Sequence, residues 1–270
     1  MAEITGIDKD SKDLKQTTID IGDGAAIPTK KDVGLFTAWR IAFFGAIAII
    51  VYLTLTKPDP YREIIAFVPD GILVTFQVTI EAILLALVIG LFTGLGRVSS
   101  SRIINGIASL YVEVIRGIPL LVQLFYIYYA LGRLVHVPDI TSAVIAMSIC
   151  YGAYMGEIFR AGIQAISKGQ MEAARSLGMT SSQTMYHVIL PQAVKTILPP
   201  IGNEFVALLK DSSLVSILAV SDLLRRGREY AAWTFSYFET YTIIALIYLI
   251  ITLFFSKLVS IMEERISVNK

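Results

Sequence analysis

Six apolar stretches, each long enough to cross a bilayer, constrain the fold of this 270-residue chain more than any other feature. A helix that spans the hydrocarbon core needs about 20 apolar residues, because it rises about 1.5 Å per residue. The stretches are too long for membrane β-strands and do not alternate. The sequence therefore predicts an all-α membrane protein of about six transmembrane helices. The stretches lie at residues 35–56, 71–96, 109–131, 140–162, 197–220 and 240–260.

Composition supports a chain embedded in a lipid bilayer. Hydrophobic residues make up 55% of the sequence and charged residues 17%, whereas soluble domains carry about 25% charge. The formal net charge of +1 gives no field that would attract nucleic acid, so no nucleic-acid partner is expected. A single cysteine excludes a disulfide within the chain, and the two histidines stand in no ligand-spacing motif, so we expect no metal site.

An unusually long N-terminal region precedes the first apolar stretch. Residues 1–34 are polar and show no apolar periodicity, which predicts a mostly disordered tail. As a late signal peptide, the stretch at 35–56 would have an unusually long n-region, and no A-x-A-like site follows it, so we interpret it as a retained helix. Basic residues in short loops favour cytoplasmic N- and C-termini. The group Arg225, Arg226 and Arg228 argues against that orientation.

The longest connection, residues 163–196, is not disordered in composition. Ser167 with Gln170, and Thr180 with Gln183, have the form of capping boxes, and Gly178 stands where a helix end favours a left-handed residue. These signals predict two short helices, at about 168–177 and 181–190. Because short helices are marginal in water, the loop is expected to dock on another protein or to lie on the membrane interface. Physical arguments alone leave both open.

Four sequence segments resemble one family. The stretch Glu172-Ala173-Ala174-Arg175-Ser176-Leu177-Gly178, followed by Ile189-Leu190-Pro191, resembles the EAA loop of ABC-importer permeases. Three more segments resemble those of the polar amino-acid branch (histidine, glutamine and arginine type), and together they cover about residues 69–264. These segments are Arg116–Gln123, Tyr151–Arg160 and Leu209–Leu214.

The resemblance implies a type I importer fold. Its five-helix transmembrane domain would occupy residues 69–264, with a coupling loop at 163–196 and one extra N-terminal helix at 35–56. The chain would be a multi-pass permease subunit in the cytoplasmic (inner) membrane of a bacterium, importing a polar amino acid. Implied partners are a dimer of ATP-binding-cassette ATPase subunits, a second permease subunit (identical or homologous) and an extracytoplasmic solute-binding protein. The residues implied to contact the ATPase are Glu172, Ala173, Ala174 and Gly178.

The chain itself is not expected to be an enzyme. It lacks a G-x-x-x-x-G-K-[ST] phosphate loop, so ATP and Mg would bind the partner ATPase, and no cofactor is expected on this chain. No G-x-S-x-G or H-E-x-x-H motif suggests catalytic residues of a membrane protease. The alternative function is an ion-gradient-driven secondary transporter, in which buried acidic residues would be the ion sites.

Charged and polar residues at membrane depth are the candidates for substrate binding. Such residues are costly in lipid and rarely without a role. Arg116 is expected to receive the carboxylate of an amino acid and Glu157 its ammonium group. Glu113 and Arg116 share a helix face and are expected to pair; structural pairing is the alternative for every candidate. The full candidate set is Arg116, Gln123, Glu157, Lys210 and Asp211.

Overall fold

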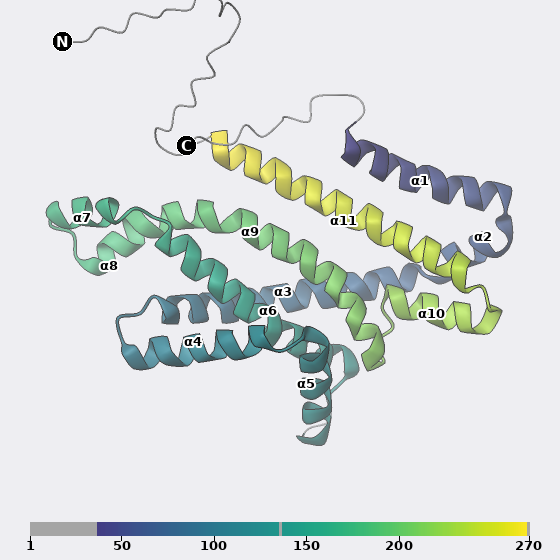
Figure 1. Ribbon diagram of the computed structural model, residues 1–270, viewed down its shortest axis with the longest axis horizontal. Coiled ribbons are helices and arrows are strands. Elements are labelled where there is room, and N and C mark those ends of the chain that lie inside the picture. Colours follow the sequence, from purple (N-terminus) through teal and green to yellow (C-terminus); the bar gives the residue numbers. More distant parts are fainter. Residues whose placement is uncertain (1–36, 135–136, 269–270) are drawn as a thin grey trace, which may run out of the picture. The chain divides into compact units, whose positions relative to one another are not determined.

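The computed structural model describes residues 37–134 and 137–268. Every secondary-structure element among these residues is a helix (Figure 1). The tail predicted at residues 1–34 lies outside them. Four helices are long and apolar enough to cross a membrane, each within one of the predicted stretches or extending it. This confirms an all-α membrane protein. The four candidate spans are α1 (Ala38–Thr56), residues 58–97 with α3 (Pro69–Arg97) as their main part, α6 (Asp139–Gln164) and most of α11 (Tyr237–Val268).

The stretch expected at 109–131 is broken in two. Helix α4 (Arg102–Gly117) and helix α5 (Leu120–Leu134) meet at a bend of 108°, and α5 turns away from the line of α4 (Figure 1). The cause is Pro119, which cannot donate a backbone hydrogen bond and holds Ile118 in an extended conformation. The stretch is therefore not one continuous helix, and the pair forms a fifth span only if it is counted as one.

The stretch expected at 197–220 is also displaced. Helix α9 runs from Leu190 to Asp211, and a 3₁₀ segment, η2 (Ser212–Leu218), follows it. Polar residues along α9 keep it out of the candidate spans found among the described residues. The helical part thus begins and ends earlier than predicted. The count of six spans is not confirmed by length and composition.

The contact between α3 and α6 is the most extensive between any two described elements. Small side chains line it, including Ala82 and Ala86 of α3 and Ala143 of α6. At Gly90, a Cβ atom would overlap the Cβ of Met155 and lie 2.9 Å from its carbonyl carbon. Membrane helices associate through such small residues because they let the backbones approach closely. The α3–α6 pair therefore forms the centre of the helix bundle.

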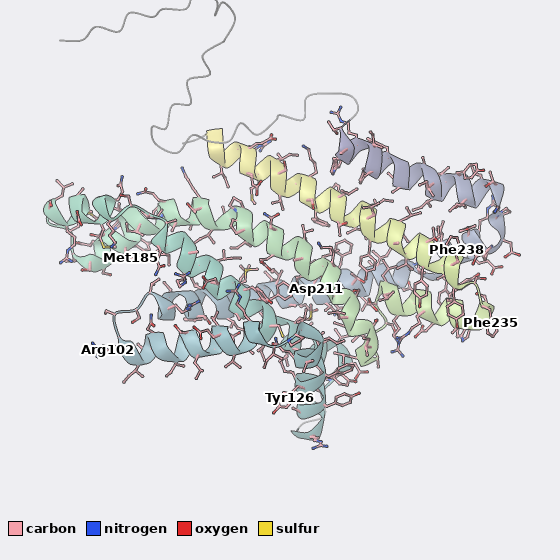
Figure 2. The ribbon with its side chains drawn as sticks, viewed as in Figure 1. Arg102, Tyr126, Met185, Asp211, Phe235 and Phe238 are labelled. Carbon is pink, nitrogen blue, oxygen red and sulfur yellow. The ribbon has the colours of Figure 1, made fainter. Side chains whose placement is uncertain are left out.

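A second apolar cluster lies at one end of the bundle. It joins helix α2 (Pro58–Phe67), helix α10 (Leu223–Thr234) and the start of α11, through Ile64, Tyr230 and Ile243. Phe235 and Phe238 mark this end in Figure 2, whereas Arg102 and Met185 mark the other. We call the first the α10 end. The second carries residues 97–102 and 163–190, and we call it the loop end.

The extra N-terminal helix lies at the edge of its own chain. Helix α1 packs on α11 and α2, and Ala46 is its one buried residue. The indole Nε1 of Trp39 donates a hydrogen bond to the carbonyl oxygen of Leu253, at 2.9 Å. Most of the α1 surface, including Phe44 and Leu55, remains exposed. Helix α1 is thus a peripheral addition to the bundle.

We predict that Gly90→Ala destabilises the protein, whereas Gly106→Ala does not. The added methyl group at Gly90 meets the backbone of Met155, and overpacking of this kind costs about 1–3 kcal/mol. A Cβ at Gly106 meets nothing within 4 Å. Thermal unfolding of the two purified variants in one detergent checks this. Equal melting temperatures would show that the α3–α6 approach does not limit stability.

Candidate functional site

The connection at 163–196 contains two short helices, but the second differs from the prediction. Helix α7 (Lys168–Ser176) confirms the first within one residue. The second is one turn of α-helix, α8 (Ser181–Thr184), continued by a π-helical turn, η1 (Met185–Ile189). π-turns are rare and are found mostly as single turns, frequently at functional sites.

Local side-chain caps fix both helices of this loop. The backbone N–H of Gln183 donates to the Thr180 hydroxyl, and the Thr180 N–H donates to the Gln183 side chain, so the predicted capping box is confirmed. The Ser167 hydroxyl accepts from the N–H of Gly169 at 3.3 Å. Among the described hydrogen bonds, Gln170 does not return one to Ser167, so the capping box expected there is wrong, although Ser167 caps the helix.

Gly178 ends α7 in the left-handed conformation that its position predicted. Its φ is +85°, and a Cβ atom there would meet nothing within 4 Å, so only the backbone angle requires glycine. The N–H of Met179 donates to the Ala174 carbonyl at 3.2 Å, and that of Gly178 to the Arg175 carbonyl at 2.9 Å. This is the Schellman arrangement, which satisfies the last carbonyls of the helix.

The exposed surface of the loop differs from the set of motif residues predicted to form a contact. Ala174 is buried, whereas Glu172 and Ala173 are exposed. Leu177 is 84% exposed and Tyr186 is 71% exposed, which is unusual for large apolar side chains on a short, capped element. Leu177 and Tyr186 were not among the residues predicted to contact the ATPase; for Leu177, an apolar residue beside the helix-ending glycine was the available signal.

Glu157 lies between two arginines rather than standing alone. Its carboxylate pairs with Arg97 of α3 and with Arg160 one turn further along α6. The pair expected between Glu113 and Arg116 is not among the ion pairs of the described residues. Instead, the Arg116 guanidinium lies over the Tyr154 ring, 5.3 Å from its centre. An open hollow of about 470 Å³ brings Arg116 and Glu157 together.

Gln123 closes the elbow between α4 and α5. Its amide nitrogen donates to the carbonyl oxygens of Ile115 and Ile118, at 2.5 and 2.6 Å. Its amide oxygen accepts from the Cys150 thiol at 2.8 Å. The side chain is buried, so the interactions described for it are internal to the chain. Gln123 therefore satisfies carbonyls that the break at Pro119 exposes.

Lys210 and Asp211 face different directions, as adjacent helical residues must. The Asp211 carboxylate accepts a hydrogen bond from the Tyr151 hydroxyl of α6 at 2.7 Å. Lys210 is exposed and lines a separate hollow of about 340 Å³ with Ser213 and Tyr248. The structure thus brings Arg116 and Glu157 into one hollow but leaves Lys210 outside it.

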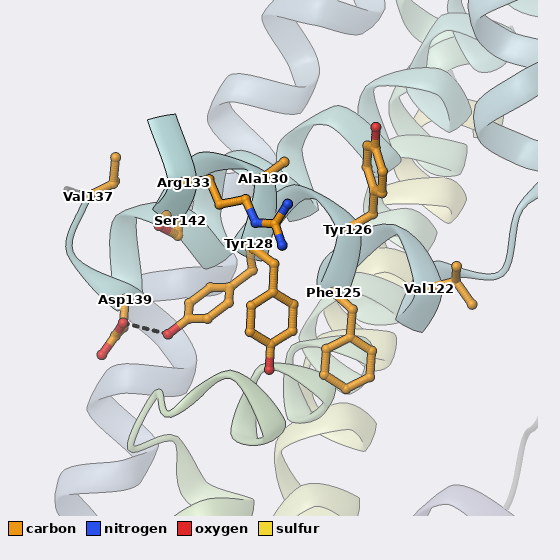
Figure 3. Close-up of a pocket in the computed structure, with 11 residues that line it drawn as sticks. Val122, Phe125, Tyr126, Tyr128, Ala130, Arg133, Val137, Asp139 and Ser142 are labelled. Atoms are coloured by element: carbon orange, nitrogen blue, oxygen red, sulfur yellow. Dashed lines mark hydrogen bonds between the residues drawn. The ribbon is translucent and has the colours of Figure 1, made fainter. Parts of the chain in front are cut away.

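A larger hollow of about 870 Å³ lies beside α5 and the start of α6 (Figure 3). The Tyr128 hydroxyl donates to the Asp139 carboxylate at 2.7 Å, and the ring of Phe125 stacks on that of Tyr129. Arg133 completes its polar lining. No motif in the sequence pointed to this aromatic hollow, although its lining residues all lie within residues 122–142, on α5 and the start of α6.

Metal chemistry has no support from this geometry. Within residues 37–134 and 137–268, no three His, Cys, Asp or Glu side chains are placed to hold a metal ion.

The described helices define a class of protein, an all-α membrane protein with a capped loop between α6 and α9. Residues 86–268 match the family described as binding-protein-dependent transport system inner membrane component. The match covers more than half of the chain, and the chain belongs to this family.

Curated relatives place the chain more closely. It is 37% identical over 202 residues to the glutamine transport system permease protein GlnP of Escherichia coli (strain K12), covering 74% of this chain and 92% of that protein. It is 35% identical over 207 residues to the arginine transport system permease protein ArtQ of Bacillus subtilis (strain 168), covering 76% and 94%.

Solved structures share the fold. A chain in the crystal structure of an amino acid ABC transporter with histidines is 46% identical, with a TM-score of 0.71 over 79% of this chain and 98% of that chain. A chain of the MetNI methionine ABC transporter in an inward-facing conformation has a TM-score of 0.61 at 19% identity, covering 73% and 97%. The latter likeness concerns the fold alone.

We predict that Gln123→Leu lowers the thermal stability of the substrate-free protein. The variant leaves the carbonyls of Ile115 and Ile118 without the donor described here, and each unpaired buried polar group costs about 1–3 kcal/mol. Thermal unfolding without and with added amino acid checks this. A residue that only contacts substrate would leave the substrate-free melting temperature unchanged.

Proposed function

We propose that this inner-membrane component imports a polar amino acid, driven by ATP hydrolysis on separate ATP-binding-cassette subunits. The observation that carries the proposal is the capped loop at 163–196, which exposes a stiff apolar surface outside the candidate spans. Family membership and the amino-acid permeases among its relatives support the same function. A short helix held by caps at both ends transmits displacement better than a flexible loop.

The topology we propose has six transmembrane helices. Five form the core, namely α3, the α4–α5 pair, α6, α9 and α11, and α1 is the additional one. Both termini and the loop end would face the cytoplasm, and the α10 end would face outward. Basic residues at the loop end, including Arg97, Arg102 and Lys168, support this orientation under the positive-inside rule.

The surface of the loop supports a contact with the ATPase. Glu172 and Ala173 are exposed there, and Gly178 sets the direction of the chain after α7. Ala174 is buried, so we assign it to packing within the loop. We add Leu177 and Tyr186 to the proposed contact, because both are largely exposed and burial of their apolar surface by a partner is favourable.

The charges around the hollow of Arg116 support binding of a zwitterion. Glu157 is already neutralised by Arg97 and Arg160. Arg116 forms no ion pair within the described residues, so its guanidinium is free to pair with a substrate carboxylate. Glu204 of α9 lies within electrostatic range of Arg116, and we propose it or Glu157 as the partner of the substrate ammonium group. Lys210, Asp211 and Gln123 then shape the path rather than hold the carboxylate.

Three kinds of partner complete the proposed importer. These are a dimer of ATPase subunits at the loop end, a second permease subunit beside this one, and a solute-binding protein at the α10 end. ATP and Mg would be bound by the ATPase. Reconstitution separates this function from gradient-driven transport: uptake by this chain alone, with an ion gradient and without an ATPase, would overturn it.

We predict that Leu177→Asp abolishes assembly with the ATPase subunit, whereas Leu177→Met preserves it. The side chain is exposed, so neither change disturbs the folded chain, but a carboxylate cannot enter an apolar cleft without a large desolvation cost. Co-purification of the ATPase and ATP-dependent uptake in proteoliposomes check this. Normal uptake by Leu177→Asp would contradict a contact at this residue.

We predict that Arg116→Gln lowers the amino acid transported per ATP hydrolysed by about tenfold, the effect of losing one charge-assisted hydrogen bond. ATP hydrolysis itself should continue, because Arg116 lies far along α4 from the loop. Arg102→Gln at the start of α4 is the control and should transport normally. Simultaneous measurement of uptake and phosphate release distinguishes uncoupling from loss of assembly.

A further inference from the structure

Helix α10 begins at a carboxylate that is completely buried. Asp222 caps the helix, and none of its surface is exposed. One carboxylate oxygen accepts from the N–H of Arg225 at 3.0 Å. The other accepts from the N–H of Leu224 at 3.2 Å and from the hydroxyl of Tyr248, on α11, at 3.4 Å. Both oxygens are therefore used, and one of them links α10 to α11.

The same helix is held on α2 and α3. The N–H of Leu223 donates to the Thr75 hydroxyl of α3 at 3.1 Å. One turn later, the Arg226 guanidinium lies 4.1 Å from the centre of the Phe67 ring. The Tyr230 hydroxyl donates to the Glu63 carboxylate of α2 at 3.0 Å. The contacts continue along α10, so the helix is attached to the α2–α3 corner as a rigid body.

The other face of α10 holds η2. Arg225 and Arg228 both donate to the carbonyl oxygen of Ser216, at 3.4 and 3.3 Å. Segment η2 runs for seven residues as a 3₁₀ helix, longer than the three or four that are common, and such stretches often mark hinges. It follows directly on Asp211, whose carboxylate is bonded to Tyr151. Helix α10 thus joins the α2–α3 corner to the segment next to the proposed substrate path.

We propose that α10 is a clamp that transmits docking of the solute-binding protein to η2, and that Asp222 is the residue that positions this clamp. The inference rests on the proposed function, because it takes the α10 end as the outer face. In this view a force on the α2–α3 corner moves η2 through Arg225 and Arg228. Asp222 contacts no substrate and acts by fixing where α10 lies.

Replacing the carboxylate of Asp222 by an amide removes its charge but keeps its shape. Asn is about as good a helix cap as Asp, so Asp222→Asn retains the bond from Arg225. Its NH₂ group cannot accept from the N–H of Leu224, and it can only donate to the Tyr248 hydroxyl oxygen, where the carboxylate oxygen accepts from both groups. The link to α11 thus loses its charge and is weakened, while the helix keeps its cap. Tyr248→Phe removes the same link from the other side.

Protonation of the carboxyl has the same effect as the amide. Burial raises the pKa of Asp222 to about 6, against the effect of the Arg225 and Leu224 amides, the Tyr248 hydroxyl and the Arg228 charge. Because the pKa is raised, the folded state favours the proton, so acidification through pH 6 does not unfold the protein through this group. The charged and titratable groups on the elements packed here are Glu63, Asp70, Arg225, Arg226, Arg228, Glu229, Tyr230 and Tyr248.

The test uses the whole transporter, reconstituted with its ATPase and binding protein. Asp222→Asn should assemble normally and keep its basal ATP hydrolysis. Stimulation of hydrolysis by the loaded binding protein at about pH 7.5 should fall about tenfold, the loss for one charge-assisted hydrogen bond. Glu239→Gln, a carboxylate in the first turn of α11 that takes no part in these contacts, is the matched control and should behave as wild type.

The pH profile distinguishes positioning from a merely structural role. Wild-type stimulation should decline as the outer pH falls through about 6, and Asp222→Asn should show no such decline, so that the two converge at low pH. The loss in Asp222→Asn combined with Tyr248→Phe should be smaller than the sum of the two single losses, because both changes act on one link.

Two results would overturn the clamp alone. One is full stimulation of Asp222→Asn with the wild-type pH profile. The other is an equal loss of basal and stimulated hydrolysis. Should Asp222→Asn fail to assemble, Tyr248→Phe decides, and normal stimulation of that variant overturns the clamp. A wild-type complex that no binding protein stimulates would overturn the proposed function as well.

Discussion

The close approach of α3 and α6 is the constraint on which the other helices depend. With no hydrophobic effect to drive association within lipid, two helices pack through surface shape and van der Waals contact. Small residues such as Gly90 and Gly156 bring the two backbones together. Helices α4, α5 and α9 then pack against α6. The carboxylate of Glu157, shared by Arg97 and Arg160, joins α3 to α6 a second time near the loop end.

Backbone polarity explains the elbow between α4 and α5. A broken helix at membrane depth is tolerated only where other groups satisfy the freed carbonyls. Gln123 does so for Ile115 and Ile118, from within the helix that follows the break. The elbow is therefore a fixed bend. It turns α5 away from the line of α4 (Figure 1), and the aromatic hollow lies beside α5.

Local rules predicted the parts of this molecule that local forces determine. The lengths of the apolar stretches predicted α1, α3, α6 and α11, and the side-chain caps predicted α7 and its end at Gly178. Each of these signals depends on residues only a few positions apart. The size of the bend at Pro119 depends on tertiary packing, so no local pattern sets it. Likewise, Arg97 is 60 residues from Glu157, so no local pattern pairs them. The burial of Ala174 depends on the packing of α7 against η1.

Helix α1 attaches to the bundle by a narrow seam, with Trp39 bonded to Leu253 and Ala46 as its one buried residue. Few of its side chains are therefore constrained by neighbours. At the other positions of α1, any apolar residue of similar volume is acceptable. Its sequence can therefore vary during evolution as long as the helix remains apolar. Such a helix can be gained or lost in evolution without compensating substitutions in the neighbouring helices.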